Sequence, residues 1–400
     1  MANKKISVNS QKGQEICREV LEKREKYESR MSPRLAKWVE GSALYNGKSW
    51  SSGENRKPSI CTSELYKAVR AMRNMCHRML LGQKPFFSLE SLDIISYEEP
   101  DKLIKAEHYC AQNAELAKFD NGLATFLDHL FLYGTAVAKC VYEPIKNSFL
   151  GKKQYVTKFK PVSLINVAFG LDSSDVDDSS WVTVTDFKSK TELAKLIVYD
   201  EKQEIYDHKG IGAAQAVEEC RPKVNTWTQQ RLAVQGYTDD YKGALEWIVY
   251  HGPLECYGKP DEEFCVEIIN GEFIIRMEQY DGLKPILIAT TGNIDDPMGN
   301  GIIDMHLPLL REIDDLSNAL ANMVYLAGAS MFAKQKSLGE EDSEFMIRQF
   351  GFMNMENPVI NPIGPDANNI TALAQLLQAK IQQFRQASGA TDQLQAIVTG

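Results

Sequence analysis

The chain has 400 residues, of which 44% are hydrophobic and 25% are charged, and its formal net charge is −9 at pH 7. These values are those of an ordinary globular protein with two or three cores, because a domain typically holds ~100–200 residues. They argue against a membrane protein, since no apolar run approaches the ~18 residues that a span needs. They also argue against broad, tight binding to nucleic-acid phosphates, which depends on Lys and Arg. The first residues, MANKKISVNSQ, lack the apolar segment of a signal peptide.

Helical periodicity dominates the first third of the chain. Residues 10–30 predict a charged amphipathic helix, with a second short helix after Pro33. Residues 60–82 place apolar side chains three and four positions apart on one face and end at Gly82. Residues 101–133 repeat this pattern, after which YGT turns the chain into the alternating strand AVAKCVYE.

The stretch GSALYNGKSWS, at residues 41–51, contains the Gly-Lys-Ser of a phosphate-binding loop. Gly41 and Gly47 enclose five residues, whereas the G-x-x-x-x-G-K-[ST] loop has four, and such a loop should follow a buried strand and open a helix. The preceding stretch is helical. We therefore expect an exposed turn here, and the alternative is a nucleotide site at Gly47, Lys48 and Ser49.

The middle of the chain predicts short strands and turns. Residues 154–187 include an acidic, serine-rich loop at 172–180, where a solvated turn is favoured over a divalent-cation site because the glycine and closing glutamate of an EF-hand loop are missing. In GKKQYVTKFK, lysines alternate with Tyr155 and Phe159. This fits a strand with solvent-facing lysines, the favoured interpretation, or a nucleic-acid surface. A short helix, SKTELAKLIVYD, follows, and residues 205–243 show no firm periodicity.

Strands return at 245–288, with an Asn-Gly hairpin turn at 270–271. A glycine-rich turn, MGNG, then opens a long helix with apolar side chains at regular helical spacing. A loop rich in Pro and Asn, ENPVINPIGPDANN, precedes a last helix from Thr371 to about Ala387.

Motifs of known chemistry are absent from the sequence. No HExxH, GxSxG or GxGxxG occurs, the six histidines form no metal-type pair, and the eight cysteines include no C-x-x-C. The cysteine pattern fits reduced thiols in a cytosolic setting. From the residues alone we predict an α+β protein of several parts, with no catalytic residue, metal site or cofactor.

The order of several degenerate motifs resembles that of the portal proteins of tailed bacteriophages, especially short-tailed phages. The motifs are YNGKSW, LFLYGTAVAKCVYEP, SSWVTVTDF, SKTELAKL, EWIVYHG, LKPILIATTG and MGNGIIDMHLPLLREIDDLSNALANM. The last is the most specific, since it is similar to the Gly-x-Gly turn and long helix of that family. The resemblance runs from about residue 12 to residue 400 and depends on the order of the motifs.

The resemblance implies an α+β portal fold with a helix-rich wing, a two-helix stem and a β-containing clip, assembled as a ring. Five segments would take these parts in order: 1–170 for the first part of the wing, 171–209 for the first stem segment, 210–298 for the clip and adjoining strands, 299–328 for the second stem helix, and 329–400 for the rest of the wing. The stem helices would run over 190–204 and 302–327. The last segment would hold a tunnel loop at about 358–370 and a wing helix at 371–387. The crown helices with which portals continue are not evident after this helix.

As a portal subunit, the chain would be a structural protein of the virion, at the portal vertex of the capsid, made in the host cytoplasm, and not an enzyme. It would form a ring, generally of twelve copies, through which double-stranded DNA is packaged and ejected. Its other partners would be the large subunit of the terminase, a tail adaptor, and the major capsid and scaffolding proteins, with no membrane and no cofactor. Six side chains are candidates for facing the DNA channel: Lys188, Lys190, Lys195, Asn361, Asn368 and Asn369.

Two other classes of protein stay open at this point. A smaller head–tail adaptor or tail-ring protein would also be an oligomer without chemistry, although such adaptors are usually much shorter and lack paired stem helices. A nucleotide hydrolase would depend on Lys48 and its neighbours, and an assay of ATP or GTP hydrolysis would detect it.

Overall fold

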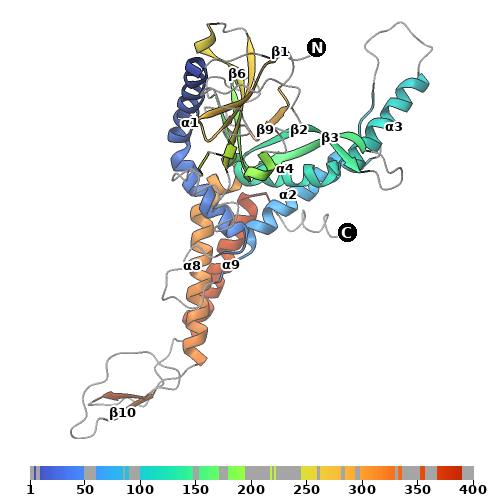
Figure 1. Ribbon diagram of the computed structural model, residues 1–400. Helices are drawn as coiled ribbons and strands as arrows, with labels where there is room; N and C mark the ends of the chain where they lie inside the picture. Colours follow the sequence, from blue (N-terminus) through green and yellow to red (C-terminus); the bar gives the residue numbers. More distant parts are fainter. Residues whose placement is uncertain are drawn as a thin grey trace. The chain divides into compact units, whose positions relative to one another are not determined.

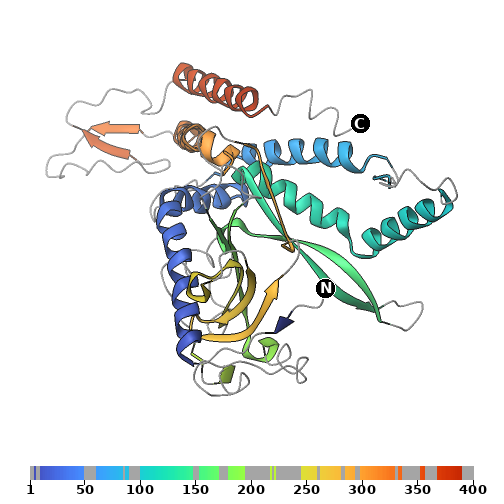
Figure 2. The same ribbon diagram turned by 90° about the horizontal axis from the view of Figure 1, so that it is seen from above.

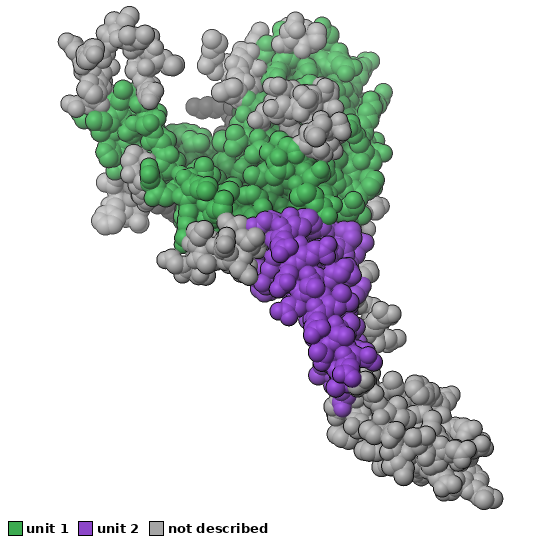
Figure 3. Space-filling view, turned by 180° about the vertical axis from the view of Figure 1, so that it is seen from behind, with its two compact units in different colours: residues 1–39, 72–305 green, residues 40–71, 306–400 purple. Residues whose placement is uncertain are grey.

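The computed structural model of the chain describes residues 4–5, 10–48, 60–83, 86–89, 100–146, 153–170, 179–193, 217–218, 220–221, 245–258, 262–280, 284–292, 298–328, 332–335, 352–355 and 367–389. These residues form a mixed α+β protein, as the sequence predicts. They belong to two compact units. Unit 1 comprises residues 1–39 and 72–305, and unit 2 comprises residues 40–71 and 306–400 (Figure 3).

A six-stranded antiparallel sheet forms a large part of unit 1. Its strands, in order across the sheet, are β1 (Lys4–Lys5), β8 (Phe273–Tyr280), β7 (Glu263–Ile269), β6 (Leu245–Pro253), β5 (Val182–Lys188) and β4 (Val167–Phe169). Short 3-10 helices, η1 (Leu164–Asn166) and η2 (Glu255–Tyr257), adjoin β4 and β6. The predicted Asn-Gly turn is confirmed between β7 and β8, where Asn270 and Gly271 have φ values of 52° and 69°.

The first part of helix α1 (Ser10–Tyr45) covers one face of this sheet (Figure 2). Ile16 and Val20 are four residues apart, so they lie on one side of the helix. Both are fully buried, in one cluster with Ile248 and Phe264 of the sheet. Full burial of an aliphatic side chain of this size stabilises a fold by roughly 1.5–3 kcal/mol, so these contacts anchor the helix to the sheet.

The expected helix break after residue 30 is wrong, because α1 continues as one helix of 36 residues through Pro33. A proline inside a helix removes one backbone hydrogen bond and usually kinks or ends the helix. Here Leu35 and Trp38, which follow the proline, are buried. We infer that the packing of these side chains offsets the lost hydrogen bond, which local sequence reasoning could not weigh.

Unit 1 also contains a three-stranded antiparallel sheet, in the order β3 (Lys153–Val162), β2 (Thr135–Lys146) and β9 (Ile286–Thr290). Phe126 lies on helix α4 (Phe119–Tyr133), which precedes β2 in the chain. Its ring lies 5.3 Å from that of Phe159, in an edge-on arrangement. A Cβ atom on Gly122 of that helix would lie 2.6 Å from the carbonyl oxygen of Phe159. Helix and sheet therefore pack closely at this point.

The single helix expected over 101–133 is in fact two helices, α3 (Pro100–Leu116) and α4 (Phe119–Tyr133). Lys118 lies between them with a left-handed backbone, at a φ of 56°. A residue with a Cβ atom adopts that conformation at an energetic cost, and it cannot continue a right-handed helix. Because the apolar pattern continues across the break, periodicity alone could not locate it.

Unit 2 contains most of two long helices, α8 (Ile302–Gly328) and α9 (Ala367–Ala387), which confirm the two long helices predicted in this part of the sequence. They run antiparallel and side by side (Figure 1), since Glu312 pairs with Lys380 at 2.9 Å and, nearer the start of α8, the ring of His306 lies 5.9 Å from that of Phe384.

Helix α2 (Glu64–Leu81) begins in unit 2, where Arg385 of α9 donates to Glu64 at 2.9 Å. Its end agrees with the predicted stop at Gly82. Strands β10 (Phe332–Gln335) and β11 (Phe352–Met355) form a short parallel pair.

The compact units differ from the segments that the portal resemblance implies. The expected boundaries at residues 170 and 209 fall within unit 1, because β4, β5 and β6 belong to one sheet. The boundary near 299 lies close to the division between the units at residue 305. The acidic loop at 172–178 lies outside the described residues, as does all but 190–193 of the helix expected at 190–204.

We predict that Ile16→Ala lowers the free energy of unfolding of unit 1 by about 2–4 kcal/mol, because it leaves a cavity between α1 and the sheet. Chemical denaturation followed by circular dichroism would measure the change. Arg18→Ala, on the exposed side of the same helix, is the control and should change stability by less than about 0.5 kcal/mol. Equal effects of the two variants would contradict this packing.

Candidate functional site: the glycine turn before helix α8

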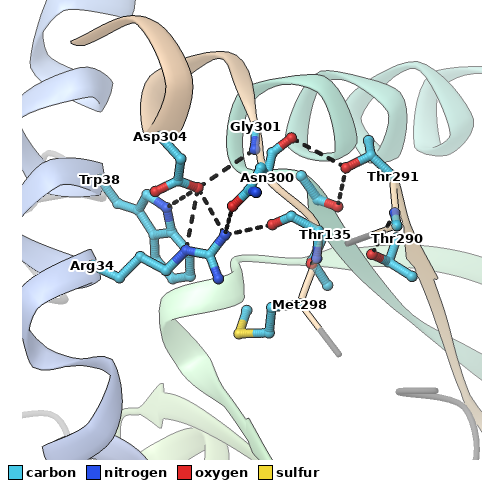
Figure 4. Close-up of polar contacts among 12 residues, drawn as sticks. Arg34, Trp38, Thr135, Thr290, Thr291, Met298, Asn300, Gly301 and Asp304 are labelled. Atoms are coloured by element: carbon cyan, nitrogen blue, oxygen red, sulfur yellow. Dashed lines mark hydrogen bonds and ion pairs between the residues drawn. The ribbon is translucent and has the colours of Figure 1, made fainter. Parts of the chain in front are cut away.

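The turn Gly299, Asn300 and Gly301 leads into α8 at Ile302 and packs against the turn at Gly134, between α4 and β2. Figure 4 shows this region, to which α1, β2, β9 and the start of α8 all contribute. All of these residues belong to unit 1.

Backbone lies directly on backbone in this turn. A Cβ atom on Gly299 would lie 2.2 Å from the carbonyl oxygen of Gly134, and one on Gly301 would lie 2.2 Å from that of Leu132. Gly134 has a φ of 79°, and a Cβ atom there would lie 2.4 Å from the carbonyl carbon of Asn300. Because real Cβ atoms essentially never approach so closely, only glycine fits at the three positions.

Arg34 of α1 holds the turn from the side. Its Nη2 donates to the carbonyl oxygen of Gly299 at 2.6 Å and to Oδ1 of Asn300 at 2.8 Å, and it lies 3.1 Å from Oδ2 of Asp304. The planar guanidinium can serve several acceptors at once, which a lysine ammonium on a flexible stem does less well. Arg34 therefore joins the turn and the first helical turn of α8 to α1.

Asp304 completes the start of α8. It lies in the first turn of the helix and accepts from the Gly301 N–H at 3.4 Å, as the acid of a capping box does. It also accepts from the indole N–H of Trp38 at 3.4 Å. A carboxylate at this end of a helix interacts favourably with the helix dipole, so Asp304 both caps the helix and compensates the charge of Arg34.

Threonine hydroxyls contact three further backbone groups at this turn. Thr135 of β2 accepts from the Gly299 N–H at 3.1 Å through its buried hydroxyl. The hydroxyl of Thr291, just after β9, lies 3.2 Å from the carbonyl oxygens of Gly134 and Asn300. The arrangement contains no side chain poised as a nucleophile or as a general base, and what it can do is hold the start of α8 rigidly.

A second polar cluster of unit 1 surrounds Trp247 on β6. The ammonium of Lys188 lies 3.7 Å from the centre of the indole ring, and that of Lys139 lies 5.5 Å away. The indole N–H donates to Glu267 at 3.2 Å. Burial lowers the pKa of both lysines, that of Lys139 to about 8. These lysines are therefore engaged within the protein.

The six side chains predicted to face a DNA channel are not brought together within one unit. Lys188 lies on Trp247, and the ammonium of Lys190 donates to the carbonyl oxygen of Glu218 at 2.6 Å, both in unit 1. Asn368 and Asn369 are exposed in the first turn of α9, in unit 2. Lys195 and Asn361 lie outside the described residues. Their role in a channel stays a prediction.

The described part of the Gly-Lys-Ser stretch, Gly47 and Lys48, closely follows the C-terminal end of α1. The N–H of Gly47 donates to the carbonyl oxygen of Leu44 at 3.0 Å and that of Lys48 to Ala43 at 2.8 Å. A phosphate loop needs such N–H groups to point at the ligand, at the start of a helix. The described part of this stretch therefore lacks the geometry of a phosphate loop, and Ser49 lies outside it.

In the described part of the chain, no group of three or more His, Cys, Asp or Glu side chains is arranged to hold a metal ion. None of the helices described combines the length and apolar character that crossing a bilayer requires.

Neither known protein-family models nor curated proteins match this chain.

The sequence showed part of this site and missed the rest. MGNG and YGT were both recognised as turns, although nothing in the sequence indicated that they pack on each other. Arg34 and Trp38 were missed, because they lie more than 260 positions before Asp304. The one local signal was Asp304 itself, three residues after Gly301, where a capping acid is expected.

We predict that Gly134→Ala destabilises unit 1 by more than about 3 kcal/mol, because the new Cβ atom meets backbone that cannot move aside. Gly292→Ala is the matched control: Gly292 has a φ of 80°, but its Cβ atom would meet nothing within 4 Å. That variant should lower the free energy of unfolding by only about 1 kcal/mol, because alanine adopts the left-handed backbone less readily than glycine. Thermal unfolding of both would separate backbone strain from backbone packing, and equal losses would contradict the close contact.

Acid sensitivity follows from a buried histidine in unit 1. His251 on β6 is buried, with Cys265 4.0 Å away. Burial, with the positive charges of Lys139 and Lys284 in addition, lowers the pKa of His251 to about 4. The unfolded chain keeps a histidine pKa near 6.5. Between about pH 6.5 and 4 the unfolded state therefore binds more protons, and folding stability falls as the pH falls.

We predict that, between pH 6.5 and 4, unit 1 of the His251→Gln variant loses about 3 kcal/mol less stability than unit 1 of the wild type. This value assumes ~1.36 kcal/mol for each unit of pKa difference. Urea unfolding at several pH values in this window measures it. His129, whose pKa burial also lowers to about 4, should still cause a residual loss. The same pH slope in the wild type and in His251→Gln would refute this origin of acid sensitivity.

Proposed function

We propose that this chain is a portal (head–tail connector) subunit of a tailed bacteriophage, of the short-tailed type, and that about twelve copies form a ring around a channel for double-stranded DNA. The observation that carries the proposal is helix α8. It begins at the Gly-x-Gly turn that the family resemblance led us to expect, and its 27 residues span about 40 Å at 1.5 Å per residue. This length suits a helix that runs along a channel.

The antiparallel contact between α8 and α9 supports a two-helix stem. Glu312 and Lys380 join the helices, and Phe384 is fully buried beside His306. We therefore assign α9 as the stem partner of α8, in place of the helix expected at 190–204. The clip for the terminase and the tail adaptor would then be the connection between them, residues 329–366, which includes β10 and β11.

The exposed surface of α9 suits DNA that has to slide. The helix has no acidic residue, and amide side chains are exposed along it: Asn368, Asn369, Gln375, Gln378, Gln382, Gln383 and Gln386. Its two cations, Lys380 and Arg385, are paired with Glu312 and Glu64. Each strong lysine or arginine contact adds to the affinity for phosphates, so a neutral amide surface would guide a duplex without holding it.

Apolar side chains on the same two helices favour a ring of copies. Val324 and Tyr325 of α8 are 54% and 60% exposed, and Leu376 of α9 is 46% exposed. A head-to-tail contact that repeats until the rotation closes would cover such surfaces. Obligate interfaces of this kind typically bury ~2,000 Å² or more.

In this proposal the protein has a structural role at the capsid vertex of the virion. The ring would meet the terminase large subunit during packaging and a tail adaptor afterwards, with the major capsid and scaffolding proteins around it. The glycine turn would hold the start of each α8 helix in place while DNA moves past.

We predict that the purified protein forms closed rings with a central channel of about 30–40 Å, wide enough for a ~20 Å duplex with its counterions. Electron microscopy in negative stain shows the rings and their symmetry. A double variant, Val324→Asp with Tyr325→Asp, should run as a 45.0 kDa monomer with unchanged circular dichroism, because it places charges in the apolar contact.

The control for this variant is Arg18→Asp, on the exposed side of α1, which should leave the rings intact. A wild-type protein that stays monomeric at micromolar concentration would contradict the proposal. Rings that bind a tail adaptor but not the terminase large subunit would favour the smaller head–tail adaptor class.

A further inference from the structure

The apolar stripe of helix α2 is buried in its first half and exposed in its second. Leu65 and Val69, in the first half, are buried. The stripe then continues at the three- and four-residue spacing of one helical face over five more side chains: Met72, Met75, Cys76, Met79 and Leu80. Of these, Met79 is 73% exposed and Leu80 is 52% exposed. The helix therefore carries the pattern of a packed helix into a part of the surface that is open to solvent.

Helix α4 lies beside α2 (Figure 1), but on its polar side. Arg73 pairs with Asp128 of α4 at 3.4 Å, and His77, one turn further along α2, also pairs with a carboxylate of α4. Met75 and Met79 follow these two residues by two positions each, which is a rotation of about 200° around the helix axis. The methionines therefore point away from α4, and the contact with α4 leaves the stripe uncovered.

The residue types in the second half of α2 are those of a protein–protein interface. Methionine and arginine are enriched at such interfaces, whereas lysine, glutamate and aspartate are depleted. Residues 72–81 contain three methionines and two arginines, and no lysine, glutamate or aspartate. Methionine is flexible and polarizable, so it adapts to an irregular partner surface. This part of the helix therefore suits a protein partner.

Charge favours an acidic partner, and the rest of this chain is acidic. Helix α2 has four cations and one acid, a net charge of +3. Because the whole chain has a net charge of −9, the residues outside α2 have a net charge of −12. Complementary charge steers two surfaces together and fixes their orientation. A basic helix on one copy that meets a different, acidic surface of the next copy makes a head-to-tail contact, which can repeat around a ring.

We propose that the second half of α2, residues 72–81, docks on a second copy of this chain, with Met79 and Leu80 buried in the contact. The contact would remove from water the most exposed part of the stripe, which is the expected fate of an exposed apolar patch on a protein that assembles. This inference rests on the proposed ring for its head-to-tail arrangement. It adds a contact in unit 1 to the contact of α8 and α9 in unit 2.

Sedimentation velocity of the full-length protein at micromolar concentration tests the proposal. Met79→Asp with Leu80→Asp should weaken association about tenfold or more, because a few anchor side chains carry most of the affinity of an interface. Met79→Leu with Leu80→Met keeps the surface apolar and should associate as the wild type does. Arg18→Asp, on the exposed side of α1, is the control for an added acid and should have no effect. Circular dichroism should be the same for all variants.

A photo-cross-linking amino acid in place of Met79 locates the contact directly. Irradiation should yield a covalent dimer, with twice the 45.0 kDa mass of one chain. Mass spectrometry should find the linked peptide of the second copy in an acidic region. The same amino acid in place of Gln14, which is exposed near the start of α1, should yield no dimer.

The outcomes separate this contact from the proposed ring. If the wild type forms rings and the Met79→Asp, Leu80→Asp variant forms them equally well, the α2 contact is wrong and the ring stands. If the wild type forms dimers that this variant loses, the α2 contact stands and the ring is wrong. A wild type that stays monomeric overturns both, and its binding to vesicles with anionic lipid would assign this basic helix to a membrane surface instead.

Discussion

The contact between the backbones of Gly134 and the Gly299–Gly301 turn is the constraint on which the start of α8 depends. No side chain fits there, because each Cβ atom would meet backbone atoms at 2.6 Å or less. The surrounding polar groups then have fixed positions, so that Arg34 can reach three acceptors at once. Asp304, which caps the helix, is one of those acceptors. Steric exclusion thus sets the geometry, and the ion pair adds to a structure that the glycines have already defined.

Buried charge in unit 1 is compensated locally, and this determines which lysines are available to a ligand. Lys188 and Lys139 lie over Trp247, and burial lowers the pKa of each. Bringing either ammonium to a phosphate would require it to leave the indole ring. Lys158 and Lys160 share one carboxylate on an exposed ribbon, so part of their charge stays available. The number of lysines in a stretch is therefore a weaker guide to nucleic-acid contact than their burial and their partners.

Local signals predicted the elements of this fold well, and contacts between distant residues account for what was missed. The Asn-Gly turn, the strand AVAKCVYE, the long helix after the MGNG turn and the last helix from Thr371 each follow from spacing or turn chemistry within a short window. The helix break expected near Pro33 was wrong because Leu35 and Trp38 are buried against distant parts of the chain, which a local window of sequence does not contain. Lys118 was missed because its left-handed backbone leaves no trace in the apolar pattern. Half of the glycine site, the turn and its capping acid, could be predicted from local sequence. The other half, Arg34 and Trp38, could not, since only the fold brings α1 to the turn.

In the proposed portal subunit, the same distinction between local and distant information decides which helices would form the stem. The resemblance to portal proteins implied the helix expected at 190–204 as the partner of the long helix. Antiparallel contact is a stronger criterion, since two helices can line one channel only if they run side by side. α9 meets it through Lys380 and Phe384, and it adds an amide surface without acids that a channel for sliding DNA requires. The stretch at 190–193 instead directs Lys190 to the backbone of Glu218 within unit 1. If the chain is a portal subunit, the physical case for α8 and α9 as the stem is therefore stronger than the case from motif order.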